Sequence, residues 1–178
     1  IISGGIDLSV GSMLCALGAM LMYLLDEGAG PLAAMGLSGA PAYAVAIVLI
    51  MLAGVIMGLM NGALISYGKL PPFIATLGTQ QIIRGVCTIL TKGYPISKLP
   101  EGYMFLGQGE FLGIPMAVWC MVVVAIICHI FLEETVTGRR IFALGGNAEA
   151  TRISGINTKA LLMLVYTLCA VLAGFAGI

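Results

Sequence analysis

The chain has 178 residues, of which 60% are hydrophobic and 9% are charged, and its mean hydropathy is +1.10. Soluble domains usually contain about 45 to 50% apolar residues, so this composition excludes a soluble domain and indicates an all-α, polytopic transmembrane helical bundle. The formal net charge is zero, which leaves no overall basic field to favour nucleic acid as a partner.

Five apolar windows are candidate membrane spans, because a helix needs about 20 apolar residues to cross the bilayer core. They cover residues 10–25, 42–65, 70–91, 114–132 and 160–178. The first is short, and the fourth has Pro115 in its first turn, where the missing N–H removes no helical hydrogen bond. The chain opens at Ile1 without an initiator methionine and stops at Ile178 within an apolar run, so we expect an internal fragment of a longer protein.

The stretch ISGGIDLSVGS, residues 2–12, places an acid among glycines and serines beside the first apolar window. Glycines allow an irregular backbone, and Asp7 needs polar partners within a membrane. This pattern predicts a broken helix or a re-entrant turn that faces a cavity. The stretch lacks the GK[ST] ending of a P-loop, and the chain contains no GxGxxG phosphate cradle. If transport is driven by ATP, another polypeptide must bind the ATP.

The second window carries small residues at helical spacing. Gly54, Gly58 and Gly62 recur every four residues, and Asn61 lies beside them on the same face. This spacing allows two helices to approach closely, and an asparagine can donate a hydrogen bond across such an interface. Helix packing is the favoured interpretation, and a substrate contact for Asn61 is the alternative.

The third window, which includes FIATLGTQQIIRG, is the most polar of the five. Its three- and four-residue spacing gathers several side chains near one helical face. They are Phe73, Thr76, Gln80, Arg84 and Cys87, with Thr79 and Gln81 at the borders of the face. Such a face is costly against lipid, so it must face other helices or water. It either forms interhelical hydrogen bonds, with Arg84 at the outer interface, or lines the path of a polar solute.

The charges between the windows predict the orientation. The loop at residues 133–159 contains Arg139, Arg140, Arg152 and Lys159, whereas residues 26–41 contain two acids and no base. Because cytoplasmic loops are enriched in lysine and arginine, the first loop is predicted to be cytoplasmic and the second external. Alternation then places Lys69 inside and residues 92–113 outside.

The basic loop contains the signals of a short helix at residues 148–154. Asn147 is a good N-cap, Glu149 falls in the first turn, and Arg152 falls in the last turn. Gly155 suits the left-handed position that follows a helix. The exposed small and apolar residues Ala148, Ala150 and Ile153 favour docking to a partner, and the alternative is a helix that lies on the membrane surface.

The sequence contains no catalytic constellation. His129 is the only histidine, and with Glu133 it makes a weak candidate for a metal site. The five cysteines are scattered and form no CxxC pair, which disfavours a disulfide framework and a zinc site. We therefore expect no enzyme activity, no metal and no cofactor in this chain.

Three motifs together resemble a known family. They are SGGIDLSVGS at residues 3–12, NGALISYGKLPPFIATLGTQQIIRG at residues 61–85 and GRRIFALGGNAEATRISGIN at residues 138–157. The outer loop YPISKLPEGYMFLGQGEFLGIP at residues 94–115 is also similar. In this order they resemble the permease subunit of bacterial ABC importers for monosaccharides, of the ribose, xylose and galactose type. The resemblance covers nearly the whole chain.

The resemblance implies a protein of about ten spans in the bacterial inner membrane, surrounded by lipid and paired with a second permease copy as a homodimer or heterodimer. It also implies a cytoplasmic ABC ATPase subunit and a periplasmic or lipid-anchored sugar-binding protein as partners. Residues 133–159 are then similar to the cytoplasmic coupling loop, whose short helix sits in a groove of the ATPase. The positions that match this pattern are Gly138, Ala143, Gly145, Asn147, Ala150, Ser154 and Gly155, whereas Thr151 stands where alanine is more usual.

The sequence thus predicts a permease domain over residues 1–178 that makes and breaks no covalent bond. The predicted coupling residues are Gly138, Arg139, Gly145, Asn147, Ala148, Glu149, Ala150, Arg152, Ser154 and Gly155. The candidate substrate pathway consists of Asp7, Asn61, Thr76, Thr79, Gln80 and Arg84. The alternative from another class is a self-contained secondary transporter or channel for a small polar solute, because a broken helix and a polar span would also suffice there. A membrane-embedded enzyme is the third hypothesis.

Overall fold

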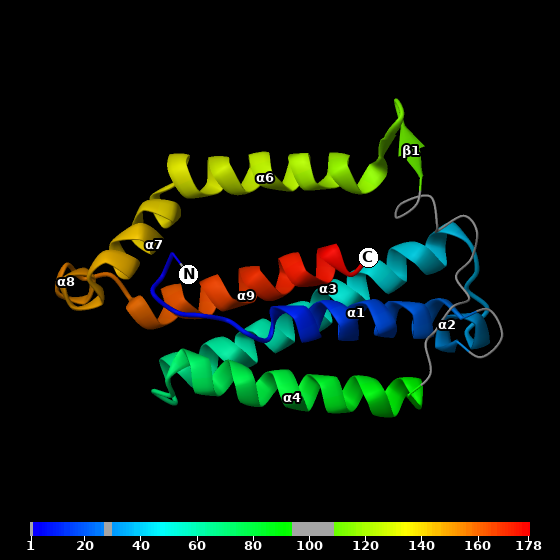
Figure 1. Cartoon of the computed structure of the whole chain (residues 1–178), viewed down its shortest axis with the longest axis horizontal. Coiled ribbons are helices and arrows are strands. Elements are labelled where there is room, and N and C mark those ends of the chain that lie inside the picture. The colour runs from blue at the N-terminus through cyan, green and yellow to red at the C-terminus, as the bar shows by residue number, and fades with distance from the viewer. Residues whose placement is uncertain (1, 27–29, 94–108) are drawn as a thin grey trace.

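The computed structural model describes residues 2–26, 30–93 and 109–178 of the chain. Within these residues nearly all regular structure is helical (Figure 1). The elements in chain order are α1 (Val10–Leu25), α2 (Pro31–Ala34), α3 (Ala40–Ser66), α4 (Pro72–Thr91), β1 (Glu110–Phe111), β2 (Ile114–Pro115), α6 (Met116–Glu134), α7 (Val136–Gly146), α8 (Ala148–Ile153) and α9 (Thr158–Ala176).

Each predicted window contains a helix, which confirms the all-α, polytopic fold class. Four described helices, α3, α4, α6 and α9, are long and apolar enough to cross a membrane. The helix in the first window, α1, has 16 residues and is a shorter apolar helix, as its sequence indicated. The long helices run roughly side by side, so the ends of the bundle collect the connecting segments (Figure 1).

The helix α1 lies at the centre of the bundle, against α3, α4 and α9. Its fully buried side chains Met13 and Leu17 and the nearly buried Leu21 recur every four residues, which is the spacing of one helical face. They pack with Ile50 of α3 and Ala170 of α9 in the main hydrophobic cluster. Although α1 is short, burial of this apolar face therefore holds the helix in place within the bundle.

The glycines of α3 form a close contact with the helix α9. A Cβ atom at Gly58 would lie 2.5 Å from the Cα atom of Thr167, and one at Gly62 would lie 2.7 Å from the Cα atom of Met163. Both contacted residues belong to α9, so only glycine permits this approach of the two backbones. The prediction that the glycine repeat packs against another helix is confirmed.

The helix α6 is placed differently from the other long helices. Its main contacts are with α7 and β2, and none of its residues is buried within the described part of the chain. Figure 1 shows it running beside the bundle, at a distance from α1 and α4. Its apolar surface, which includes Met121 and Ile127, is therefore exposed to lipid or to further protein.

Two details differ from the sequence prediction. Pro115 does not lie in the first turn of a helix, because it belongs to β2 and precedes the first residue of α6. It pairs with Glu110 in a two-residue hairpin, whose turn uses Leu112 and Gly113 with φ of 55° and 75°. The indole Nε1 of Trp119 donates a hydrogen bond to the Phe111 carbonyl oxygen at 3.2 Å and so holds the hairpin on α6. Most of the predicted outer loop, residues 94–108, lies outside the described residues.

The second difference is in the basic loop. The residues that precede the short helix form a separate helix, α7, which the sequence analysis did not predict and which ends at Gly146. Gly145 and Gly146 are therefore the last residues of α7. The Thr135 side chain starts α7, since its Oγ1 accepts a hydrogen bond from the Gly138 N–H at 3.0 Å.

Candidate functional site

The segments that connect the helices lie at two opposite ends of the bundle. One end holds α7, α8 and the turn between α3 and α4, and the other holds α2 and the β1–β2 hairpin (Figure 1). At the first end the ammonium group of Lys159 lies 5.1 Å from the centre of the Tyr67 ring, which is a cation–π distance. This grouping of the connecting segments agrees with the predicted alternation of loops. Which end faces the cytoplasm stays a prediction.

The short helix α8 has the predicted caps. The Asn147 side-chain Oδ1 accepts a hydrogen bond from the Ala150 N–H at 2.9 Å, which satisfies one of the free donors of the first turn. Ser154 is the C-cap residue that follows the helix, and Gly155 comes next with φ of 81°, in the left-handed region that favours glycine. The helix ends at Ile153, one residue before the predicted end.

An ion pair joins the two charged residues of α8. The carboxylate of Glu149 accepts hydrogen bonds from the Arg152 guanidinium, with the shorter N to O distance at 2.6 Å. The hydrogen bond and the charge of Arg152 lower the pKa of Glu149, and Glu149 raises the pKa of Arg152. Both side chains are about two-thirds exposed, so the pair shapes the surface of α8 more than it stabilises the fold.

The two faces of α8 have different neighbours. Thr151 is 4% exposed and donates its hydroxyl to the Asn147 carbonyl oxygen at 2.8 Å, so it lies on the inner face. Ile153 is 76% exposed, and Ala148, Glu149 and Ala150 are also exposed. The departure from the family pattern at Thr151 therefore affects the inner face and leaves the outer face unchanged.

The other predicted coupling residues lie in α7 and at its ends. Gly138 is buried, and a Cβ atom there would overlap the Leu132 carbonyl oxygen. Arg139 is exposed and donates to the Glu134 carbonyl oxygen at 3.5 Å. A Cβ atom at Gly145 would overlap the carbonyl oxygen of Ile2, so the last turn of α7 contacts the N-terminal segment.

The N-terminal segment leads into a buried polar network. The Ser9 hydroxyl donates to Asp7 Oδ1 at 2.6 Å and accepts from Asn61 Nδ2 at 2.8 Å. Asp7 Oδ1 also accepts from the Ser9 backbone N–H at 2.9 Å. The Asn61 amide group therefore donates its hydrogen bond to a residue that precedes α1, and not across the contact between α3 and α9. Residues 52 positions apart in sequence are joined here, and Asp7 has the polar partners that the sequence predicted for it.

The polar face of α4 is divided by the structure. Thr76 is fully buried, and its Oγ1 accepts a hydrogen bond from the Leu8 N–H at 3.3 Å, which links α4 to the N-terminal segment. Thr79 is also buried, but its hydroxyl donates to carbonyl oxygens of its own helix. Gln80 is half-buried and Arg84 is exposed. The structure thus brings Asp7, Asn61 and Thr76 together and leaves Arg84 apart.

Tyr166 is a further polar residue at this network that the sequence analysis missed. It is 3% exposed, and its hydroxyl oxygen lies 2.5 Å from the position that a Cβ atom would take on Gly5. Within the described residues the Tyr166 hydroxyl, Asp7 Oδ2 and Asn61 Oδ1 are buried without a hydrogen-bond partner. The only sequence signal was a tyrosine within an apolar window, which packing explains equally well.

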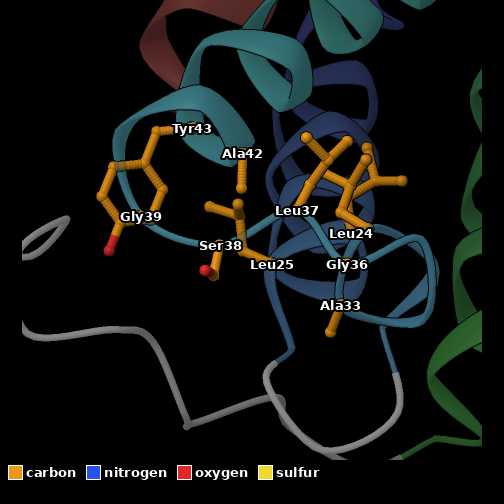
Figure 2. Close-up of a pocket in the computed structure, with 10 residues that line it drawn as sticks. Leu24, Leu25, Ala33, Gly36, Leu37, Ser38, Gly39, Ala42 and Tyr43 are labelled. Atoms are coloured by element: carbon orange, nitrogen blue, oxygen red, sulfur yellow. The ribbon is translucent and has the colours of Figure 1, made fainter.

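Two pockets lie at opposite ends of the bundle. One of about 480 Å³ is formed where α1 ends and α3 begins, and its lining includes Leu24, Leu37 and Tyr43 (Figure 2). The other, of about 380 Å³, lies between the N-terminal segment, the α3–α4 turn and the start of α8. Ser3, Lys69 and Ala148 contribute to its lining, together with apolar side chains.

The fold and these sites define a multi-pass helical membrane protein with a capped helix at one end of its bundle. Residues 1–178 match the family described as branched-chain amino acid transport system / permease component, and the chain belongs to this family. It is therefore a multi-pass protein of the inner membrane, and four of its described helices are long and apolar enough to cross that membrane. No solved structure matches the chain.

Curated relatives carry the names of sugar permeases. The chain is 38% identical to the ribose import permease protein RbsC of Bacillus subtilis, over 99% of this chain and 52% of the relative. It is 37% identical to RbsC of Escherichia coli K12, over 100% of this chain and 53% of the relative. The D-allose transport system permease protein AlsC of the same strain is 32% identical, over 100% of this chain and 51% of the relative. The chain thus spans about half the length of these relatives.

Proposed function

We propose that this chain forms part of the permease subunit of an ABC importer that moves a monosaccharide across the inner membrane, driven by a separate ATPase subunit. The observation that carries this proposal is the full-length match of the chain to a permease family, together with relatives named for ribose and allose transport. The three motifs that resemble monosaccharide permeases support the same substrate class.

The coupling site in this proposal is the short helix α8, which follows the end of α7. The caps at Asn147 and Gly155 fix both ends of α8, and the exposed face that carries Ala148, Ala150 and Ile153 is free to contact another protein. A short helix held in this way moves as a rigid unit. ATP-driven closure of a cytoplasmic ATPase subunit would displace this unit and switch the bundle between outward and inward access.

The pathway in this proposal runs along the polar groups of the N-terminal segment, α3 and α4. An uncharged sugar needs donors and acceptors that replace its water, and this region contains unpaired polar atoms on Asp7 and Asn61. Thr76 joins the same network through Leu8. Gln80 and Arg84 extend the polar face of α4 toward the opposite end of the bundle, with Thr79 beside them.

The partners follow from the same proposal. They are a cytoplasmic ABC ATPase, a periplasmic or lipid-anchored sugar-binding protein, and a second permease copy, identical or closely related. The exposed apolar surfaces of α6 and α4 suit contact with lipid and with further spans.

The test is uptake of labelled sugars by the complete transporter in proteoliposomes. We expect uptake of at least one pentose or hexose that requires ATP, the ATPase subunit and the binding protein. Amino acids such as leucine serve as the matched control, since the family description names branched-chain amino acids. Uptake that follows an ion gradient without ATPase would instead support a secondary transporter, and uptake of leucine alone would overturn the sugar assignment.

A further inference from the structure

The end of α7 and the N-terminal segment touch backbone to backbone. A Cβ atom at Gly145 would overlap the Ile2 carbonyl oxygen and would lie 3.4 Å from the Cα atom of Ser3. The next residue, Gly146, has no neighbouring atom within 4 Å of the corresponding position. Contact is therefore confined to one face of the last turn of α7, at a position where any side chain would push the segment away.

The same segment contacts the polar network within seven residues of this point. Gly5 lies against the Tyr166 hydroxyl, and the Leu8 N–H donates to Thr76. Asp7 and Ser9 then connect to Asn61 through side-chain hydrogen bonds. One short stretch of chain thus touches α7 at one end and α3, α4 and α9 at the other.

The surroundings of the segment leave room for displacement. The pocket of about 380 Å³ is lined by Ser3, Gly4 and Gly5 on one side and by Leu144 and Ala148 on another. Because protein interiors are close-packed, a displaced backbone needs free volume beside it. Gly4 has φ of 78° and nothing within 4 Å of its Cβ position, so the segment bends here without a side chain that would anchor it.

We infer that residues 2–9 transmit the displacement of α7 and α8 to the polar network of Asp7, Ser9, Asn61 and Thr76, and that Gly145 is the positioning residue at which the displacement enters the segment. This inference rests on the proposed coupling function. It adds a physical route inside the permease: α8 moves with α7, Gly145 presses on Ile2, and the segment shifts the donors and acceptors that face the solute.

The test compares Gly145→Ala with Gly146→Ala in the complete transporter, reconstituted with its ATPase. Both changes add one methyl group to the same helical turn, but only Gly145→Ala meets the Ile2 carbonyl. We expect Gly145→Ala to lower the sugar transported per ATP hydrolysed several-fold, and Gly146→Ala to leave this ratio near the wild-type value. Equal ratios in the two variants would overturn the inference.

A second measurement does not depend on a tight substitution. Cysteines at Ser3 and Ala148, which line the same pocket, are joined by a short bifunctional maleimide in a background without native cysteines. We expect the cross-link to stop uptake while ATP still binds, and its rate to differ between nucleotide-free and ATP-trapped complexes. Normal uptake after complete cross-linking would contradict the inference.

The two levels of proposal fail separately. If the wild-type complex transports sugar with ATP and α8 variants uncouple it, but Gly145→Ala and the cross-link have no effect, only the route through residues 2–9 is overturned. If the wild-type chain neither assembles with an ATPase nor transports sugar, the coupling function fails, and the route fails with it.

Discussion

At the scale of the residue, glycines and small polar groups decide the contacts that matter in this protein. Gly58 allows α3 and α9 to touch, and Gly145 allows α7 to touch the N-terminal segment. Asn61, although it lies beside the α3 glycines, is directed to Ser9. Neighbouring positions of α3 therefore have two roles. The glycines, which lack a side chain, allow the packing contact with α9, and Asn61, which can form hydrogen bonds, joins the polar network.

Gly58→Ala should weaken the α3–α9 contact. The added methyl group would meet backbone atoms of α9, and overpacking of this kind costs about 1 to 3 kcal/mol. Gly85→Ala is the matched control, because it lies in α4 with nothing within 4 Å and should stabilise the helix by about 0.5 to 1 kcal/mol. Unfolding of the purified complexes in detergent measures both changes. Equal stabilities of the two variants would contradict the prediction, because they would show that α3 and α9 accommodate the added methyl group without cost.

Thr76→Val should reduce transport more than it reduces assembly. Valine keeps the shape of threonine but removes the acceptor of the Leu8 N–H, and loss of such a hydrogen bond costs about 0.5 to 1.5 kcal/mol. Thr88→Val is the control, because among the described residues the Thr88 hydroxyl donates to the Arg84 carbonyl oxygen, within its own helix. Uptake normalised to the amount of purified complex separates an effect on transport from an effect on assembly. Loss of assembled complex with normal specific uptake would make Thr76 a packing residue only.

At the scale of the element, the caps of α8 explain how six residues form a defined helix. A helix this short is marginal by itself, because nucleation costs more than its few hydrogen bonds return. The side chain of Asn147 satisfies one end, and the left-handed Gly155 closes the other. Thr151 anchors the inner face, so the exposed face is presented in one orientation.

Gly155→Val should uncouple the transporter. A β-branched residue at φ of 81° is strained by about 1 to 3 kcal/mol, so the end of α8 would move or fray. We expect loss of uptake and of transport-stimulated ATPase activity while the permease still inserts and assembles. Gly155→Asn, which tolerates the left-handed region, should retain most of the coupling. Normal stimulation in the valine variant would count against a role for α8 geometry.

At the scale of the whole molecule, the bundle places two kinds of surface at opposite ends. The basic segments, with α7 and α8, share one end with the α3–α4 turn, and α2 shares the other end with the hairpin (Figure 1). The connecting segments alternate between the two ends because each long helix runs from one end of the bundle to the other. Lysine and arginine enrichment at the first end predicts that it faces the cytoplasm.

Cysteine labelling in intact cells tests this orientation. Asn147→Cys should be unreactive toward a membrane-impermeant thiol reagent, and Ala33→Cys should react, in a background without the native cysteines. Both positions are exposed, so a difference in reactivity reports the side of the membrane rather than burial. Permeabilised cells, in which both should react, provide the control. The opposite pattern would reverse the topology.

The sequence by itself determined the membrane class, the helices of the five apolar windows and the caps of α8, because each depends on local composition, spacing or backbone conformation. Apolar runs of sufficient length require helices in a bilayer, and an asparagine and a glycine at the ends of a short helix need no tertiary information. For the same reason the spacing of Gly54, Gly58 and Gly62 predicted a close helix contact correctly.

Only the tertiary structure decided which groups meet. Helical periodicity placed Thr76 and Arg84 near one face, but Thr76 lies buried against the N-terminal segment, whereas Arg84 is exposed. The partner of Asn61, the position of Tyr166 and the contact of Gly145 with Ile2 join residues that are far apart in the chain. Spacing along one helix fixes the direction of a side chain relative to its own axis, whereas the neighbour in that direction depends on how the helices pack.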